Sequence, residues 1–97
     1  MLNDMIEMVE GYGEWAHGGD LVDVAKDWIE AGFDVSGARD WLGGGCWDAR
    51  SAKALRDAGM TAEQAGEYTE IGGCPAKIGS AVSNNDLNVE DAMTLIQ

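Results

Sequence analysis

Hydrophobic and polar positions along this 97-residue chain repeat with a short period. Alanine recurs every 13 or 14 residues, with a large side chain three residues after each alanine and a glycine seven residues after it. The alanines are Ala25, Ala38, Ala52 and Ala65, the large residues Trp28, Trp41, Leu55 and Tyr68, and the glycines Gly32, Gly45, Gly59 and Gly72. In three of the four units an apolar residue follows the glycine directly: Phe33, Cys46 or Met60. The repeat covers residues 24–74.

Each unit predicts one short helix that ends at its glycine. Residues three apart share a helix face, so the alanine and the large residue should face the core together. Glycine suits the left-handed conformation that often follows a helix, and the apolar residue after it can pack back on that helix. Capping residues then begin the next helix: Asp34 or Ser36, Asp48, and Thr61 in a capping box with Gln64.

Weaker helical signals lie on both sides of the repeat. They are an apolar stripe at Leu2, Met5, Ile6 and Val9, a capping Asp20 before residues 21–31, Pro75 in the first turn of residues 75–83, and a capping Asn88 before a last helix. No segment alternates at period two, so no sheet is predicted. We expect one all-α domain over residues 1–97, built as a compact cluster or short superhelix of about seven short helices.

Two segments of the repeat carry a resemblance. Residues 28–33 (WIEAGF) and 55–65 (LRDAGMTAEQA) resemble the short Ala/Trp/Gly helical repeats of proteins from actinobacteria and their phages. The resemblance implies an all-helical fold and a phage or mobile-element origin, and it carries no active-site residues. The glycine run at 43–45 and the turn at 71–75 depart from the repeat style.

The net charge of the chain indicates which class of partner it binds. The net charge is −12, which disfavours direct binding to nucleic acid or to an anionic membrane and favours a basic protein surface as partner. Residues 1–34 hold nine acids and one base, residues 35–78 six acids and five bases, and residues 79–97 three acids and no base. Two-thirds of the net charge therefore lies in the first third of the chain.

The candidate partner-binding residues follow from this asymmetry. Early acids recur at helical spacing, where like charges repel one another and a basic partner would relieve the repulsion. Trp47 joins them because tryptophan is common at interface hot spots, although it and Trp41 could instead both fill the core. The candidates are Asp4, Glu7, Glu14, Asp20, Asp23, Asp27, Glu30 and Trp47. The alternative is an ordinary solvated helix face that only keeps the protein soluble.

No catalytic, metal-binding or cofactor-binding pattern is found. His17 is the sole histidine, which disfavours a zinc site and a Ser/His/Asp triad. Asn84, Asp86 and Asn88 mimic the start of a calcium loop, but valine and leucine occupy the positions that need glycine and glutamate, so a turn before a capped helix is expected. The glycine-rich stretches lack the context of a phosphate loop. We expect a protein that is not an enzyme and binds no cofactor.

Cys46 and Cys74 form no CxxC motif, and no signal peptide or membrane segment is evident, so we expect a cytoplasmic protein with reduced thiols. A bridge between the two cysteines stays open. The expected function is an acidic protein-binding module, in its concrete form a phage-type inhibitor whose acids occupy phosphate sites on a nucleic-acid-handling protein. The alternative is a structural or assembly protein that self-associates through apolar helix faces.

Overall fold

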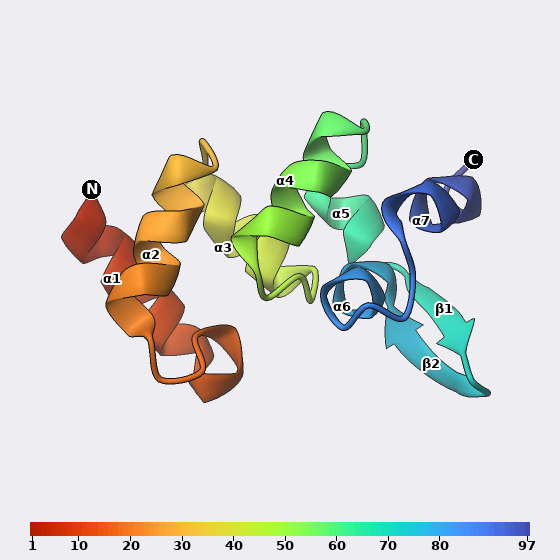
Figure 1. The fold of residues 1–97 in the computed structure, drawn as a ribbon, viewed down its shortest axis with the longest axis horizontal. Helices are drawn as coiled ribbons and strands as arrows, with labels where there is room; N and C mark the ends of the chain where they lie inside the picture. The colour runs from red at the N-terminus through yellow and green to blue at the C-terminus, as the bar shows by residue number, and fades with distance from the viewer.

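Short helices make up most of this protein, as a computed structural model of residues 1–97 shows (Figure 1). The helices are α1 (Leu2–Tyr12), α2 (Leu21–Glu30), α3 (Val35–Gly43), α4 (Ala49–Asp57), α5 (Ala62–Ala65), α6 (Ile78–Ser83) and α7 (Val89–Leu95), and a 3₁₀ turn, η1 (Glu14–Ala16), follows α1. The strands are β1 (Tyr68–Ile71) and β2 (Cys74–Lys77). The mainly helical expectation is confirmed, and no helix is long and apolar enough to cross a membrane.

The helices stack in two rows along the long axis (Figure 1). In one row α1 contacts α3 and α3 contacts α5, and in the other α2 contacts α4 and α4 contacts α6. The body measures 37 × 24 × 17 Å, and the two termini lie at opposite ends. Its radius of gyration of 12.7 Å is close to that of a compact chain of this length, about 12.5 Å.

Three repeat units end their helices in the same way. Gly32, Gly45 and Gly59 adopt positive φ angles of 92°, 89° and 105°. The N–H of the apolar residue after each glycine donates to the carbonyl of the unit's large residue, at 3.0 to 3.1 Å. The pairs are Phe33 with Trp28, Cys46 with Trp41, and Met60 with Leu55. This is the Schellman closure, so the predicted role of glycine is confirmed in these units.

Helix α6 uses the same closure without glycine. Asn85 takes the left-handed position with a φ of 63°, and the N–H of Asp86 donates to the carbonyl of Ala81 at 2.8 Å. Asparagine is the residue that best replaces glycine in this conformation. The turn predicted at residues 84–86 is thus confirmed.

Most predicted N-caps are also confirmed. The side chains of Asp34, Asp48, Thr61 and Asn88 each accept the backbone N–H three residues later, and Thr61 forms the complete capping box. Asp20 is the N-cap residue of α2, as predicted, but its side chain makes no capping hydrogen bond. Its backbone, with φ −106° and ψ 52°, lies outside the extended conformation that turns a capping side chain toward the helix.

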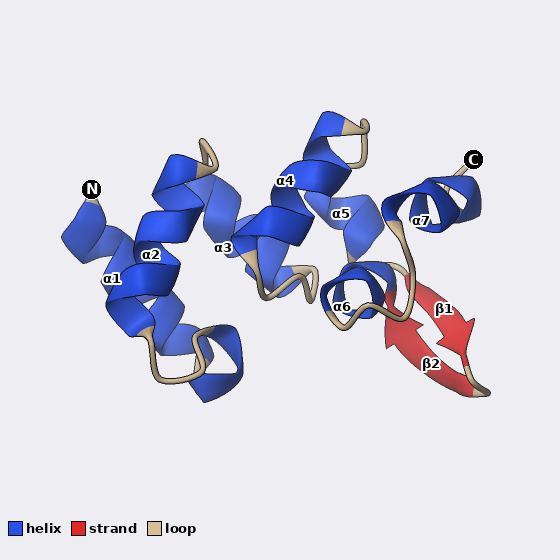
Figure 2. Ribbon diagram, viewed as in Figure 1, coloured by secondary structure: helices blue, strands red, loops and turns tan.

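A β-hairpin replaces the helix end expected in the fourth repeat unit, so the all-α expectation is wrong there. Figure 2 shows the two strands of the hairpin in red. Helix α5 is only four residues long, and Tyr68 lies in β1 with 69% of its surface exposed. Gly72 does not end a helix, because it and Gly73 form the two-residue turn between the strands, both at positive φ. Such a turn matches the right-handed twist of antiparallel strands, and this local signal outweighs the repeat pattern.

The helix expected over residues 75–83 is wrong at its start. Pro75 lies in β2 opposite Glu70, and α6 begins at Ile78. In a two-residue hairpin the closing pair, Ile71 and Cys74, exchanges hydrogen bonds, and the next pair does not. Proline therefore occupies the position in β2 where a missing N–H costs nothing.

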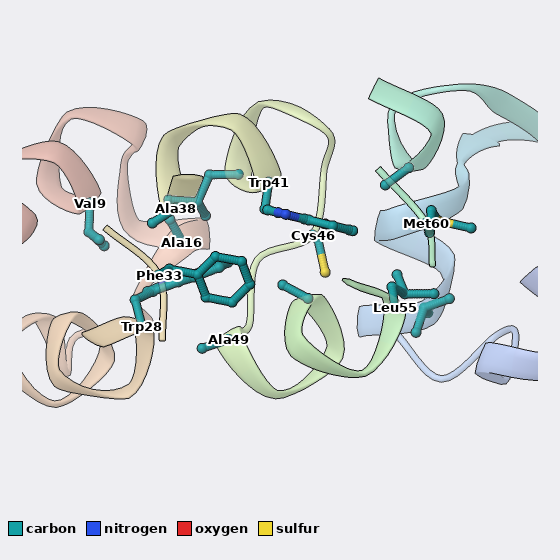
Figure 3. Packing of buried hydrophobic residues seen from close by; sticks show 14 of the residues in the cluster. Val9, Ala16, Trp28, Phe33, Ala38, Trp41, Cys46, Ala49, Leu55 and Met60 are labelled. Carbon is teal, nitrogen blue, oxygen red and sulfur yellow. The ribbon is translucent and has the colours of Figure 1, made fainter. Parts of the chain in front are cut away.

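One contiguous hydrophobic core runs through the helical body from Met5 to Ala92. The four repeat alanines are fully buried in it. Phe33 lies between two repeat tryptophans, its ring centroid 5.0 Å from that of Trp28 and 6.4 Å from that of Trp41 (Figure 3). Edge-to-face ring pairs of this kind add about 0.5–1.5 kcal/mol each beyond burial, and here they join α2 to α3.

Arg56 of α4 ties the segment that follows α2 to α4, its neighbour in the same row. Its guanidinium lies 4.4 Å from the centroid of the Phe33 ring and donates to the carbonyl of Ala31 at 3.0 Å. The Arg56 side chain thus makes both a cation–π contact and a charge-assisted hydrogen bond to the segment that follows α2. Arg56 also pairs with Asp57, at 3.4 Å.

The glycine run between Trp41 and Cys46 serves close packing. A Cβ at Gly44 would lie 2.8 Å from the carbonyl oxygen of Ala62, and one at Gly79 would lie 2.9 Å from that of Gly44. The backbone that leaves α3 therefore touches α5 and α6 directly. The run departs from the repeat style because three elements meet at this point.

The helix closures predict that two glycine-to-alanine substitutions change the free energy of unfolding in opposite directions. Gly59→Ala should lower the free energy of unfolding by about 1–2 kcal/mol, because alanine resists positive φ. A Cβ there has room, its nearest neighbour being Met93 at 3.9 Å, so the cost is a backbone cost.

Gly11→Ala is the matched control, since Gly11 lies inside α1 with nothing within 4 Å of the added Cβ. It should raise the free energy of unfolding by about 0.4–1 kcal/mol. Urea unfolding followed by circular dichroism measures both. Equal effects of the two substitutions would contradict the assigned helix closure.

Candidate functional site

The acids chosen from the sequence are all exposed and have no basic partner within the chain. The structure contains two ion pairs, and both involve Asp57, which contacts Lys53 at 2.8 Å and Arg56 at 3.4 Å. The hydrogen bond from Lys53 lowers the pKa of Asp57. None of the nine acids in residues 1–34 takes part in such a pair, so their charge is uncompensated.

These acids do not form one cluster. Asp4 and Glu7 border a shallow hollow beside Val35 and Arg39 of α3. Glu14, Asp27 and Glu30 border two adjoining grooves between α2 and α4. Asp20 and Asp23 are exposed and border none of these hollows.

The groove at one end of α2 and α4 brings Trp47 together with a second tryptophan. It has a volume of about 480 Å³, and we call it the tryptophan groove. Its apolar wall includes Trp15, Val24, Trp47 and Ala49, and its carboxylates are those of Glu14, Asp27 and Asp48. No lysine or arginine lines it. The site is therefore aromatic and negatively charged.

Trp15 is held in place although 51% of its surface is exposed. Its ring meets the ring of Tyr12 edge to face, with centroids 5.9 Å apart and planes at 87°. Tyr12 in turn donates its hydroxyl hydrogen to the carbonyl of Arg39 at 3.1 Å. Sequence reasoning missed Trp15, because it lies in a short turn between glycines and outside any helical period.

Trp47 is exposed and Trp41 is buried, with 36% and 5% of their surfaces accessible. The expectation left open whether both fill the core, and only Trp41 does. The indole N–H of Trp47 donates to the side-chain oxygen of Asn84 at 3.2 Å. Since its one polar atom is engaged, Trp47 offers the groove only apolar and π surface.

The three carboxylates of the groove differ in their surroundings. Asp48 caps α4 and accepts from the backbone N–H and hydroxyl of Ser51 at 3.1 and 3.0 Å, and from the hydroxyl of Ser83 at 2.6 Å. Glu14 and Asp27 accept no side-chain hydrogen bond within the chain. These two can therefore bind a cation, whereas Asp48 mainly supports the structure.

The adjoining groove between α2 and α4 has a different character. It shares Asp27 and Asp48 with the tryptophan groove, but Arg50 and Lys53 also line it. Its volume is about 430 Å³. The negative character is thus strongest at the end that carries the two tryptophans.

His17 and Cys46 are the remaining reactive groups near the groove. The Nδ1 atom of His17 accepts the N–H of Gly19 at 3.1 Å, and no group of three or more His, Cys, Asp or Glu side chains lies close enough to hold a metal ion. The Cys46 sulfur lies 3.4 Å from the hydroxyl of Ser83, and burial raises its pKa to about 12. A thiol so protonated is a poor nucleophile. Cys46 and Cys74 are both free.

The two cysteines should differ sharply in reactivity. With Ellman's reagent at about pH 8, where an ordinary exposed cysteine is partly ionised, the native protein should release one equivalent of thionitrobenzoate quickly. Cys74 is exposed on β2, whereas Cys46 is buried with a raised pKa and should react only after unfolding in guanidinium. Cys74→Ser should abolish the fast phase, and Cys46→Ser should leave it intact. Two fast equivalents in the native protein would contradict the burial of Cys46.

Comparison with known proteins adds no relative. No protein-family profile matches the chain, and no curated protein or solved structure is significantly similar to it. The resemblance to actinobacterial and phage helical repeats therefore stays an expectation based on sequence style.

Proposed function

We propose that this protein is an acidic protein-binding module that docks on a basic surface of another protein. The observation that carries the proposal is the uncompensated charge of residues 1–34: nine exposed acids, one lysine and no ion pair. Repulsion among these acids opposes folding and is relieved when a basic surface approaches. Complementary charge of this kind speeds association and selects partners.

The concrete form of the proposal is an inhibitor of phage type that acts on a nucleic-acid-handling protein. Such a protein presents lysine and arginine side chains where phosphates bind. The carboxylates of Asp20, Asp23, Asp27 and Glu30 recur along α2 at three- and four-residue spacing, which suits a row of phosphate sites. The protein would then compete with nucleic acid without contacting it.

Self-association is a second candidate, and one observation favours it. The hairpin consists of two strands only, so both of its edges are unpaired, and Tyr68 on it is largely exposed. Unpaired edges can accept a strand from another chain. A homo-oligomer that persists at high salt in sedimentation velocity experiments would favour this candidate over charge-driven docking.

Charge reversal tests the leading proposal. A variant with Asp20, Asp23, Asp27 and Glu30 all changed to lysine should bind a partner recovered by affinity purification at least about tenfold more weakly, because it replaces attraction by repulsion. The wild-type affinity should also fall as the salt concentration rises from about 0.05 to about 0.5 M. Calorimetric titration measures both effects, and circular dichroism checks the fold.

A matched control carries the same change in net charge elsewhere. Asp40, Glu67, Glu70 and Asp86 are exposed acids beyond residue 34, and their joint change to lysine should weaken binding far less. Equal losses in the two variants would show that only net charge matters and would reject the assigned face. Binding that is insensitive to salt would reject the proposal itself.

A further inference from the structure

We infer that the tryptophan groove receives one arginine side chain of the partner, with the guanidinium against the tryptophan rings and the free carboxylates of Glu14 and Asp27. The inference rests on the proposed function and identifies what occupies this part of the interface. It differs from general charge attraction, since it requires one planar cation at one place.

The size of the groove fits a single long side chain. At about 480 Å³ it lies within the range of small-molecule sites and is too small for a helix or strand. Val24 and the faces of the two tryptophan rings supply apolar surface along which the methylene groups of an arginine can pack. A side chain that projects from a docked surface is therefore the natural occupant.

The chemistry of the groove selects a cation. An apolar occupant would remove water from Glu14 and Asp27 without replacing its hydrogen bonds, which is costly for charged groups. An anion would be repelled. Tryptophan is the aromatic residue that attracts cations most strongly, and two of them line the groove together with the carboxylates.

Arginine fits better than lysine. A guanidinium is planar, stacks on aromatic faces and forms two parallel hydrogen bonds to one carboxylate, whereas an ammonium is a compact and strongly hydrated charge. The protein itself combines a ring and a carboxylate around a guanidinium, because that of Arg56 lies over Phe33 and donates one hydrogen bond to the carboxylate of Asp57 at 3.4 Å. The tryptophan groove offers the same combination of ring and carboxylate without an internal arginine.

Both rings are positioned before any partner arrives. Trp15 packs edge to face against Tyr12, and Trp47 donates a hydrogen bond to Asn84. Side chains that are ordered in advance lose little conformational entropy on binding. Exposed tryptophans that remain held by internal contacts are typical of a ready-made recognition site.

Peptide titration followed by NMR tests the inference. The probes are hexa-arginine, hexa-lysine and hexa-citrulline, the last being a neutral analogue of arginine with nearly the same shape. Hexa-arginine should shift the indole N–H signals of Trp15 and Trp47, while those of the buried Trp28 and Trp41 serve as internal references. Hexa-lysine should bind several-fold more weakly, and hexa-citrulline at least about tenfold more weakly, because the charge and the planar fork both contribute.

Two substitutions and two matched controls locate the site. Trp15→Leu and Asp27→Asn should each weaken hexa-arginine binding at least about fivefold. Tyr68→Leu and Asp4→Asn remove an exposed aromatic ring and an exposed acid outside the groove, and should change the affinity by less than about twofold. Asp48 is unsuitable as a test position, because it also caps α4.

The outcomes separate this inference from the proposed function. Binding of hexa-arginine without shifts at Trp15 and Trp47, or equal losses in the controls, rejects the groove while charge-driven docking stands. Equal affinity for hexa-lysine rejects arginine as the preferred occupant. Absence of binding by any peptide at millimolar concentration also rejects the groove, and the salt and charge-reversal measurements with the partner then decide the proposed function independently.

Discussion

The Schellman closure at the ends of α2, α3 and α4 is the constraint on which the rest of the structure depends. A unit of 13 or 14 residues has room for one helix and a very short turn, so the chain must reverse at once. A glycine with a positive φ angle permits this reversal. It also places the next apolar residue in the core, beside the large residue of the same unit. The closure that buries Phe33 also joins two repeat units, because the Phe33 ring packs against both Trp28 and Trp41.

The candidate site is a by-product of this geometry. Every second helix is a neighbour, so α2 and α4 lie side by side and the turns that precede them face each other across a groove. Trp47 follows Cys46, which the closure buries, and precedes Asp48, whose side chain is turned back to cap α4. The residue between two such constrained positions projects outward, and it lines the same groove as Trp15 from the turn before α2.

Sequence reasoning succeeded where the signals are local and agree with one another. The helix ends at Gly32, Gly45 and Gly59 and the caps at Asp48 and Thr61 follow from residue types a few positions apart. It failed at the hairpin, because the Gly72-Gly73 pair satisfies the repeat spacing and also forms a two-residue turn, and the second role prevails. The groove could not be predicted, since it joins turns about 30 residues apart and its shape depends on how the rows pack.

The distribution of basic residues supports a recognition role for the acids over mere solubility. Lys53 and Arg56 pair with Asp57, Arg56 also closes the end of α2, and Lys77 donates to the carbonyl of Gly43 at 3.0 Å. Three of the six basic residues are thus engaged by other groups of the same chain. Solubility would be served by negative charge anywhere on the surface. It does not require that two of the unpaired acids, Glu14 and Asp27, share a groove with two exposed tryptophans that make internal contacts, and this coincidence is what an arginine-bearing partner would use.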